Sequence, residues 1–171
     1  MHLSDAQSSK ALQNPTILPG KNVCLDTVGI IVIDDAGVMA VGSSSGGISL
    51  KQEGRVGSAA IYGAGLIIIN QDNCTVGVTC SGQGEQIIHA QLATRIAYAM
   101  LHNRDIAGEM AGVDAGSLVC VYDRHEKSVE VSWPHTTSSF CVGYKVGDGK
   151  TRFEMSRARG SSVGGMRFKY S

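Results

Sequence analysis

The sequence lacks an excess of charge of either sign. Its 171 residues carry 15 lysines and arginines against 15 aspartates and glutamates, so the formal net charge is zero. Binding to nucleic acid or to an anionic membrane through bulk charge needs a basic excess, so the balance argues against both kinds of partner. The sequence also has no apolar run of about 18 residues that could span a membrane, and its first residues show no apolar core of a secretion signal.

Cysteines in metal-binding spacing are missing too. The five cysteines are odd in number and widely spaced, and they form no Cys-x-x-Cys pair and no cysteine–histidine cluster. They are Cys24, Cys74, Cys80, Cys120 and Cys141. The pattern predicts no metal site, and we expect no cofactor. Because free cysteines in apolar strands behave as small hydrophobic residues, we expect a reducing, intracellular location in the cytoplasm, the nucleus or both.

Proline is scarce where glycine is plentiful, with 3 prolines and 22 glycines. Clustered glycines without prolines indicate tight turns and close backbone contacts rather than a disordered linker. The length fits one domain with a buried core. Residues 1–24 are polar and show no hydrophobic period, so we predict a flexible leader over residues 1–26 and a folded unit over residues 27–171.

Hydrophobic patterns predict that the folded unit is an α+β domain made mainly of antiparallel strands. Hairpin turns are expected at residues 34–37 and 70–73. The predicted strands span residues 27–34, 38–43, 65–70, 74–81, 116–123, 129–133 and 139–143. Apolar residues at helical spacing predict a helix over residues 85–102 and a weaker one over residues 105–115. The tail from Gly147 onward carries little signal.

The predicted strands are apolar in continuous runs, which is typical of strands buried on both faces. Helices would cover one face of such a sheet. Because the sequence predicts few helices, we expect a partner segment to supply the layer on the other face.

Thr27 opens the first apolar strand, directly after Asp26. A threonine hydroxyl is a poor nucleophile unless a base accepts its proton. Cleavage of the Asp26–Thr27 bond would create that base, because the new α-amino group lies on the same residue and has a pKa of about 7.7–8.0. An ordinary threonine at a strand boundary is the alternative, and the local sequence leaves both interpretations open.

Three further features allow either a chemical or a structural interpretation. Arg55, in a mostly uncharged stretch, either binds a carboxylate through bidentate hydrogen bonds or forms a surface ion pair. The turn at residues 81–84 either offers backbone N–H groups to an oxyanion or uses Ser81 to cap the following helix. The serines at 43–45 either contribute one hydroxyl to a site or belong to a surface loop.

Four segments in the same order resemble one enzyme family. DTVGIIVID, SSSGGISLKQEGRVGSAAIYGAG, CSGQGE and WPHTTSSFCVGY are similar to the β-subunit of threonine aspartase (taspase), a branch of the asparaginase-type N-terminal nucleophile hydrolases. The resemblance runs from about Asp26 to about Lys150. It implies an αββα sandwich, of which this chain is one half, built from α- and β-segments that arise by autoproteolysis of one precursor. It also implies that Asp26–Thr27 is the processed bond and Thr27 the nucleophile.

The same motifs imply roles for the residues around the nucleophile. Ser45 matches the second hydroxyl residue, which supports the nucleophile, and Arg55 matches the arginine that binds the substrate carboxylate. Ser81 matches the catalytic residue of the oxyanion-stabilising turn. Gly82 and Gly84 match the substrate-binding glycines of that turn.

The sequence departs from the family at two points. Family members that act on free amino acids carry an aspartate where this chain has Ser58, and that aspartate holds the α-amino group of the substrate. Ser58 is therefore expected to line the substrate site without binding an ammonium group. We also expect the family's α-segment to be missing from this sequence, because 26 residues before Thr27 are too few to form it.

The main prediction is therefore a threonine endopeptidase that cleaves protein substrates after aspartate. We expect it to pair with the α-segment of the same precursor as a heterodimer, and these to assemble into a heterotetramer. The alternative is a hydrolase of asparagine or β-aspartyl (isoaspartyl) bonds. A third interpretation is an inactive fragment that pairs with a full-length protein.

Overall fold

The computed structural model describes residues 26–157 and 162–169. These residues form nine strands, three α-helices and one 3-10 helix (Ser58–Ala60), and all paired strands among them run antiparallel. The elements are β1 (Val28–Ile33), β2 (Met39–Ser44), β3 (Leu66–Gln71), β4 (Cys74–Gly82), α1 (Gly84–Ala90), α2 (Leu92–Leu101), α3 (Ile106–Met110), β5 (Ala115–Asp123), β6 (Ser128–His135), β7 (Ser139–Tyr144), β8 (Arg152–Arg157) and β9 (Ser162–Lys169). The seven predicted strands are confirmed, and their ends lie within two residues of the predicted ones.

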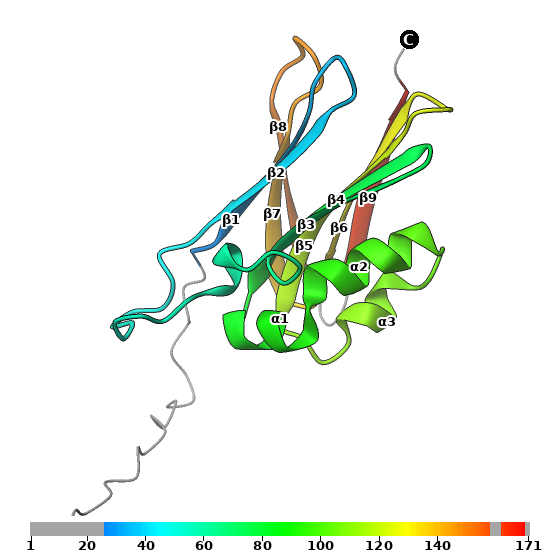
Figure 1. Ribbon diagram of the computed structural model, residues 1–171. Helices are drawn as coiled ribbons and strands as arrows, with labels where there is room; N and C mark the ends of the chain where they lie inside the picture. The colour runs from blue at the N-terminus through cyan, green and yellow to red at the C-terminus, as the bar shows by residue number, and fades with distance from the viewer. Residues whose placement is uncertain (1–25, 158–161, 170–171) are drawn as a thin grey trace, which may run out of the picture.

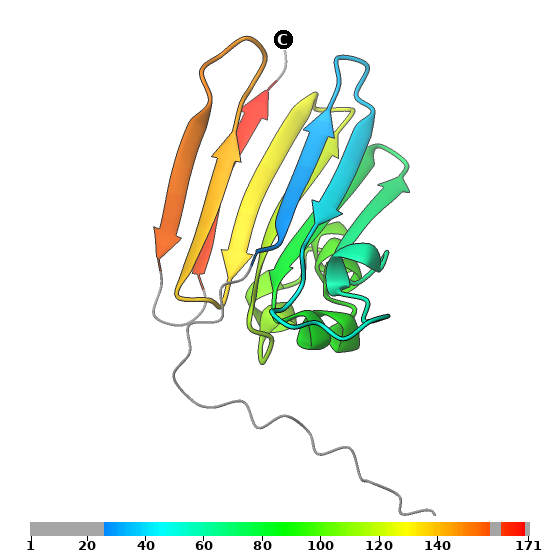
Figure 2. The same ribbon diagram turned by 90° about the vertical axis from the view of Figure 1, so that its left-hand side faces the viewer.

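Three layers are stacked in the described residues (Figure 1). The middle layer is a five-stranded sheet in the order β3-β4-β5-β6-β9. The three helices cover one face of this sheet, and the strand pairs β1–β2 and β7–β8 cover the other. Figure 2 shows these two pairs side by side in front of the five-stranded sheet. The mainly antiparallel fold with helices on one face is therefore confirmed, whereas the fourth layer of an αββα sandwich remains a prediction.

Strand β4 explains why the strand sequences show no alternation. Its residues Val76, Val78 and Cys80 belong to the core beneath the helices. Gly77 and Thr79, which alternate with them, face the β1–β2 pair, because a Cβ at Gly77 would lie 2.4 Å from the sulfur of Met39. Both faces of β4 are therefore buried, as its continuous apolar run predicts.

The second face of the five-stranded sheet corrects one expectation. No partner segment is needed there, because Met39 and the neighbouring side chains of β1 and β2 pack against Cys120 and Val129 in a second core. The face that no other described residues cover lies one layer further out, on β1. Val28, Ile30 and Val32 of β1 point away from the sheet and are 66%, 60% and 49% exposed.

Both predicted helices are shorter than their sequence patterns indicate. The first is divided at Gln91, which has a φ of +48° and separates α1 from α2. The first N–H groups of α2 donate instead to the loop before β3, from Ala93 to the Ala64 carbonyl and from Thr94 to the Gly63 carbonyl. The weaker helix is only α3, which the Asp105 carboxylate caps. None of the described helices has the length and apolar character needed to span a membrane.

The tail from Gly147 onward, where the sequence carries little signal, contains β8 and β9. Gly164 of β9 lies against the indole of Trp133 in β6, where a Cβ would be 2.0 Å from the ring nitrogen. The contact requires glycine, yet glycine in a sequence indicates a turn or a break in a strand. The predicted leader over residues 1–26 lies outside the described residues except for Asp26.

Gly29 fixes the height of β1 above β4. A Cβ at Gly29 would lie 2.3 Å from the Thr79 hydroxyl, so we expect Gly29→Ala to lift β1 and to lower the free energy of unfolding by about 1–3 kcal/mol. Adding Thr79→Ala to Gly29→Ala should recover much of this loss, because it removes the hydroxyl and methyl groups nearest to the new Cβ. Gly42→Ala is the control, because its Cβ would approach only the side chain of Ile30, at 3.2 Å, and should cost under about 0.5 kcal/mol. Urea unfolding of Gly29→Ala, of the Gly29→Ala/Thr79→Ala double variant and of Gly42→Ala, each compared with the parent, would contradict the interpretation if Gly29→Ala matched the control.

Candidate functional site

Thr27 lies directly before β1, at the junction of two cavities. The smaller has a volume of about 40 Å³ and the larger about 720 Å³. Seven of the eight predicted site residues line the smaller cavity: Asp26, Thr27, Ser45, Arg55, Ser58, Gly82 and Gly84. Ser81 lines the larger cavity, which Thr27 also borders. The fold thus brings together residues that lie up to 58 positions apart in the chain, from Asp26 to Gly84, while their chemical roles remain predictions.

Asp26 and Ser45 meet because β1 and β2 pair as a hairpin. Val28 is paired with Ser44, so the register continued by one residue places Ser45 opposite Thr27. The Ser45 hydroxyl nevertheless donates to the Asp26 carboxylate, at 2.8 Å, and accepts from the Gly47 N–H, at 3.0 Å. The Gly46 N–H donates to the other Asp26 carboxylate oxygen, at 3.0 Å. In this structure the Ser45 hydroxyl therefore donates its hydrogen bond to Asp26 and not to Thr27.

Arg55 is held between glycines and an acid. Its guanidinium nitrogens lie 3.5 Å, 3.9 Å and 3.8 Å from where a Cβ would stand at Gly47, Gly57 and Gly84. The same guanidinium donates to the carboxylate of Glu85, in the first turn of α1. This hydrogen bond holds the pKa of the Glu85 carboxyl below its ordinary value. The predicted surface ion pair is thus present, and it lies at the cavity where a carboxylate site is predicted.

Glu85 is a residue that the sequence interpretation missed. Its signal was an acid directly after the Ser81–Gly84 turn, which by itself indicates only a favourable charge at a helix start. The contact with Arg55 depends on how the loop before the 3-10 helix folds against α1, and no local pattern shows this.

Ser58 and Gly84 lie beside each other in the wall of the smaller cavity. Ser58 is buried, at 5% exposed, and its hydroxyl lies 3.6 Å from where a Cβ would stand at Gly84. A nitrogen of Arg55 lies 3.8 Å from the same point. Any side chain at position 84 would fill the space between the two residues, so glycine there keeps Ser58 and Arg55 open to one volume.

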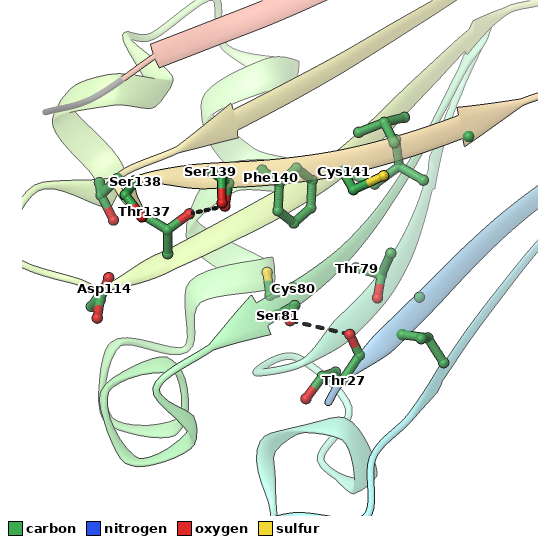
Figure 3. A pocket seen from close by; sticks show the side chains of 16 residues that line it. Thr27, Thr79, Cys80, Ser81, Asp114, Thr137, Ser138, Ser139, Phe140 and Cys141 are labelled. Carbon is green, nitrogen blue, oxygen red and sulfur yellow. Dashed lines mark hydrogen bonds between the residues drawn. The ribbon is translucent and has the colours of Figure 1, made fainter. Parts of the chain in front are cut away.

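The end of β4 contacts the residue that precedes β1. The Ser81 hydroxyl donates to the Thr27 carbonyl oxygen, at 3.2 Å (Figure 3). This carbonyl is one residue beyond that of Asp26, so in the uncut chain Ser81 orients Thr27 and does not touch the carbonyl that Thr27 would attack. At Gly82 a Cβ would lie 2.4 Å from the Asp114 carbonyl oxygen, and only glycine allows β4 to end so close to β5.

The larger cavity lies between β1 and β7, above the floor made by β4 and β5 (Figure 3). Its floor includes the Thr79 hydroxyl, which is buried and has no hydrogen-bond partner among the described residues. The neighbouring Cys80 thiol is no rival nucleophile, because burial raises its pKa to about 12. Burial likewise raises the pKa of Cys120 to about 12, and both cysteines act as the predicted small core residues. Cys141 is exposed instead.

The described residues contain no group of three or more histidine, cysteine, aspartate or glutamate side chains placed to hold a metal ion. The smaller cavity is lined by hydroxyl groups, by glycine backbone and by the Arg55 guanidinium. Such donors bind carboxylates and stabilise the oxyanion formed when a carbonyl is attacked.

Comparison with known proteins assigns the chain to a class of enzyme. The profile of the asparaginase family matches residues 2–118, which include every residue discussed for the smaller cavity. The chain belongs to the asparaginase family, whose members are hydrolases that include the isoaspartyl peptidases.

Individual proteins similar to this chain carry names from the same family. The chain is 43% identical over 75 residues to a probable isoaspartyl peptidase/L-asparaginase of Drosophila melanogaster, covering 44% of this chain and 22% of the relative. It is 34% identical over 115 residues to a probable isoaspartyl peptidase/L-asparaginase of Arabidopsis thaliana, covering 57% and 34%. It is 40% identical over 76 residues to an isoaspartyl peptidase of Escherichia coli, covering 44% and 23%. The matches span about a fifth to a third of the length of these relatives, and the narrower resemblance to threonine aspartase stays a prediction.

The lowered pKa of Glu85 can be tested by titration. The folded chain binds this proton more weakly than the unfolded chain, so the ion pair with Arg55 stabilises the fold above the ordinary glutamate pKa, and this stabilisation is lost as the pH falls through the lowered pKa. We expect an NMR midpoint for the Glu85 carboxyl below 4.5, and Arg55→Ala should raise it towards 4.5. Arg167→Ala, which removes the partner of Glu126, is the control. A Glu85 midpoint that does not respond to Arg55→Ala would contradict the assignment.

Proposed function

We propose that this chain is the nucleophile-bearing segment of a hydrolase that uses an N-terminal threonine against amide bonds of aspartyl groups. One observation carries the proposal. Thr27 starts a strand at a cavity that Ser45, Arg55 and Ser58 also line, within the region that matches the asparaginase family. A hydroxyl, a supporting hydroxyl and a guanidinium at one cavity are the groups that acyl transfer from a carboxylate-bearing substrate requires.

Self-cleavage would generate the active nucleophile. The Thr27 hydroxyl oxygen attacks the carbonyl carbon of Asp26, the C–N bond breaks, and an ester forms between Asp26 and Thr27. The hydroxyl proton passes to the released nitrogen, which becomes the α-amino group. Water then hydrolyses the ester, which restores the hydroxyl and leaves Asp26 with a terminal carboxyl group. The new amine has a pKa of about 7.7–8.0 and is therefore a suitable base near neutral pH.

Turnover would repeat these steps on a substrate. The α-amino group of Thr27 accepts the hydroxyl proton as the oxygen attacks the substrate carbonyl, and the proton is passed to the leaving nitrogen. Water then hydrolyses the acyl ester. Arg55 would hold the free carboxylate of the aspartyl group, whose position fixes which carbonyl faces Thr27.

The relatives support asparagine and isoaspartyl peptides as substrates, since they carry the names isoaspartyl peptidase and L-asparaginase. Such substrates present a charged α-ammonium group beside the carboxylate that Arg55 would bind. A buried ammonium requires an acid or several acceptors nearby. In this chain the residue expected beside the ammonium is Ser58, which is neutral. The relatives therefore do not support binding of a free α-ammonium group by this chain.

Ser58 favours a second candidate, an endopeptidase that cleaves after aspartate. In a protein substrate the α-nitrogen of the aspartate is acylated and carries no charge, so a neutral hydroxyl beside Arg55 suits it. Both candidates use the same nucleophile and the same arginine, and they differ in the charge of one substrate nitrogen.

The exposed apolar side chains on the outer face of β1 favour the proposal of an additional partner segment. Val28, Ile30 and Val32 there, and Phe153 and Met155 on β8, are exposed by about half or more. Large exposed apolar areas are rare on monomeric proteins and indicate an interaction partner. Because the chain spans only part of its relatives' length, we propose that the α-segment of the precursor covers this face, giving the heterodimer and then the heterotetramer.

The nucleophile is tested by mass spectrometry of the chain alone and of the chain combined with the α-segment. We expect cleavage between Asp26 and Thr27 in the combined sample, with a new N-terminal threonine. Thr27→Ala should abolish it, and Thr27→Ser should retain weak activity because the hydroxyl remains without the methyl group that restricts its rotamer. Ser44→Ala removes a neighbouring exposed hydroxyl and is the control. Cleavage in Thr27→Ala would exclude the proposed nucleophile, and a combined sample that never cleaves would favour the inactive fragment.

The two substrate classes are separated by peptides with aspartate or asparagine before the scissile bond, together with free asparagine and β-aspartyl dipeptides. Arg55→Ala should lower kcat/KM about 10- to 100-fold, because a shielded charge-assisted hydrogen bond contributes about 1.5–3 kcal/mol. Ser58→Asp should impair cleavage after aspartate by charge repulsion and should favour substrates with a free ammonium group. A parent enzyme that prefers β-aspartyl dipeptides would overturn the endopeptidase candidate, and equal rates on aspartate and asparagine peptides would remove Arg55 as the carboxylate ligand.

A further inference from the structure

The Asp26 side chain occupies a carboxylate site of its own. Its two oxygens accept from the Ser45 hydroxyl and from the Gly46 N–H, at 2.8 Å and 3.0 Å. The Gly47 N–H completes the turn by donating to the Ser45 hydroxyl. Backbone and hydroxyl donors that converge on one carboxylate form a built binding site for that group.

This site is distinct from Arg55. If the arginine that is expected to read the carboxylate of a substrate also read that of Asp26, the two would form an ion pair in the uncut chain. The structure instead pairs Arg55 with Glu85, and it pairs Asp26 with the turn of Ser45 and Gly46. The residue before the scissile bond is therefore held by different groups from those that would hold a substrate.

Gly46 shows how closely the carboxylate fits the turn. A Cβ at this position would lie 2.7 Å from one Asp26 oxygen, and the next atom within 4 Å is the carboxyl carbon of the same side chain. Gly46 is not among the described glycines with a positive φ, so its backbone would accept alanine. The absence of a side chain at position 46 thus serves the contact with Asp26.

We propose that the Asp26 carboxylate is an internal anchor, which closes the turn of Ser45, Gly46 and Gly47 and withholds the Ser45 hydroxyl from Thr27 until the chain is cut. The proposal rests on the self-cleavage described above and names its regulation. A hydroxyl can donate only one hydrogen bond, and in the uncut chain the Ser45 hydroxyl donates it to the Asp26 carboxylate. The contact also fixes the residue that carries the scissile carbonyl, only one position from the attacking hydroxyl.

Cleavage would then switch the partner of Ser45. Attack by the Thr27 hydroxyl oxygen breaks the Asp26–Thr27 bond, the proton moves to the Thr27 nitrogen, and water releases Asp26 as a chain end. Once Asp26 departs, the Ser45 hydroxyl and the Gly46 N–H lose their acceptor. Ser45 lies opposite Thr27 in the continued β1–β2 register, so its hydroxyl can turn towards the nucleophile. The smaller cavity, now about 40 Å³ with Asp26 in its wall, gains the volume of that side chain for a substrate.

Amide exchange tests the anchor in a chain that stays uncut. In the Thr27→Ala background, NMR-detected exchange of the amide at position 46 is measured for Asp26→Ala, Gly46→Ala, the double variant and Asp35→Ala. Asp35 lies at the other end of the same hairpin and is the matched control. We expect Asp26→Ala and Gly46→Ala each to speed exchange about tenfold, as the loss of one charge-assisted hydrogen bond predicts. The double variant should be no faster than either single variant, because both changes remove the same contact.

The rate of self-cleavage, followed by mass spectrometry in the chain with Thr27 intact and the α-segment present, tests the regulation. Gly46→Ala should slow cleavage, because Asp26, which carries the scissile carbonyl, is then no longer fixed by the turn. Asp35→Ala should leave the rate unchanged. The anchor would be overturned if Asp26→Ala left the exchange rate of the amide at position 46 unchanged. It would also be overturned if the effects of Asp26→Ala and Gly46→Ala on that rate multiplied in the double variant. Both outcomes hold whether or not the chain cuts itself. Coupled effects on exchange in a chain that never cuts would leave the anchor standing and remove the self-cleavage on which its regulatory part depends. Cleavage as fast in Gly46→Ala as in the control would overturn the regulatory part alone.

Discussion

The close approach of β1 to β4 is the constraint on which the site depends. Gly29 lies so near Thr79 that no side chain fits between the strands, and this contact fixes β1 two residues after Thr27. The Ser81 hydroxyl at the end of β4 donates to the Thr27 carbonyl, and the pairing of β2 with β1 brings Ser45 opposite Thr27. The position of the proposed nucleophile therefore follows from the packing of two sheets, and its hydroxyl needs no specific contact of its own to reach the cavity.

Two internal carboxylates satisfy the donors of the site in the uncut chain. Asp26 takes the hydroxyl and N–H groups of the turn after β2, and Glu85 takes Arg55. Buried or half-buried donors left without acceptors are costly, so a site prepared to bind carboxylates is most stable when the chain supplies them. The two acids differ in their fate. Glu85 belongs to α1 and remains with Arg55, which lines the smaller cavity, whereas Asp26 belongs to the segment that self-cleavage would release.

The elements with a strong local pattern could be predicted from the sequence, and the contacts between them could not. Thr27, Arg55 and Ser58 were identified from motifs, and the structure brings them to one cavity. The break at Gln91 was missed because the loop before β3 supplies carbonyls to α2, and β9 was missed because Gly164 accommodates Trp133. In each case a residue that is unfavourable locally is required by a neighbour distant in sequence. The pairing of Asp26 with the Ser45 turn is of the same kind, since each residue alone has an ordinary local interpretation.

The environment of β1 explains why the proposed enzyme would need another segment. Among the described residues β1 is paired at one edge, with β2, and packed on one face, against β4. Its other edge borders the larger cavity towards β7, and its other face carries the exposed side chains of Val28, Ile30 and Val32. An unpaired edge offers backbone N–H and C=O groups to an extended segment, and an apolar face favours burial. A segment that satisfied both would hold the strand that follows Thr27 on every side. It would also enclose the open cavity beside the proposed nucleophile, where electrostatic contacts with a substrate would then be stronger than in an open site.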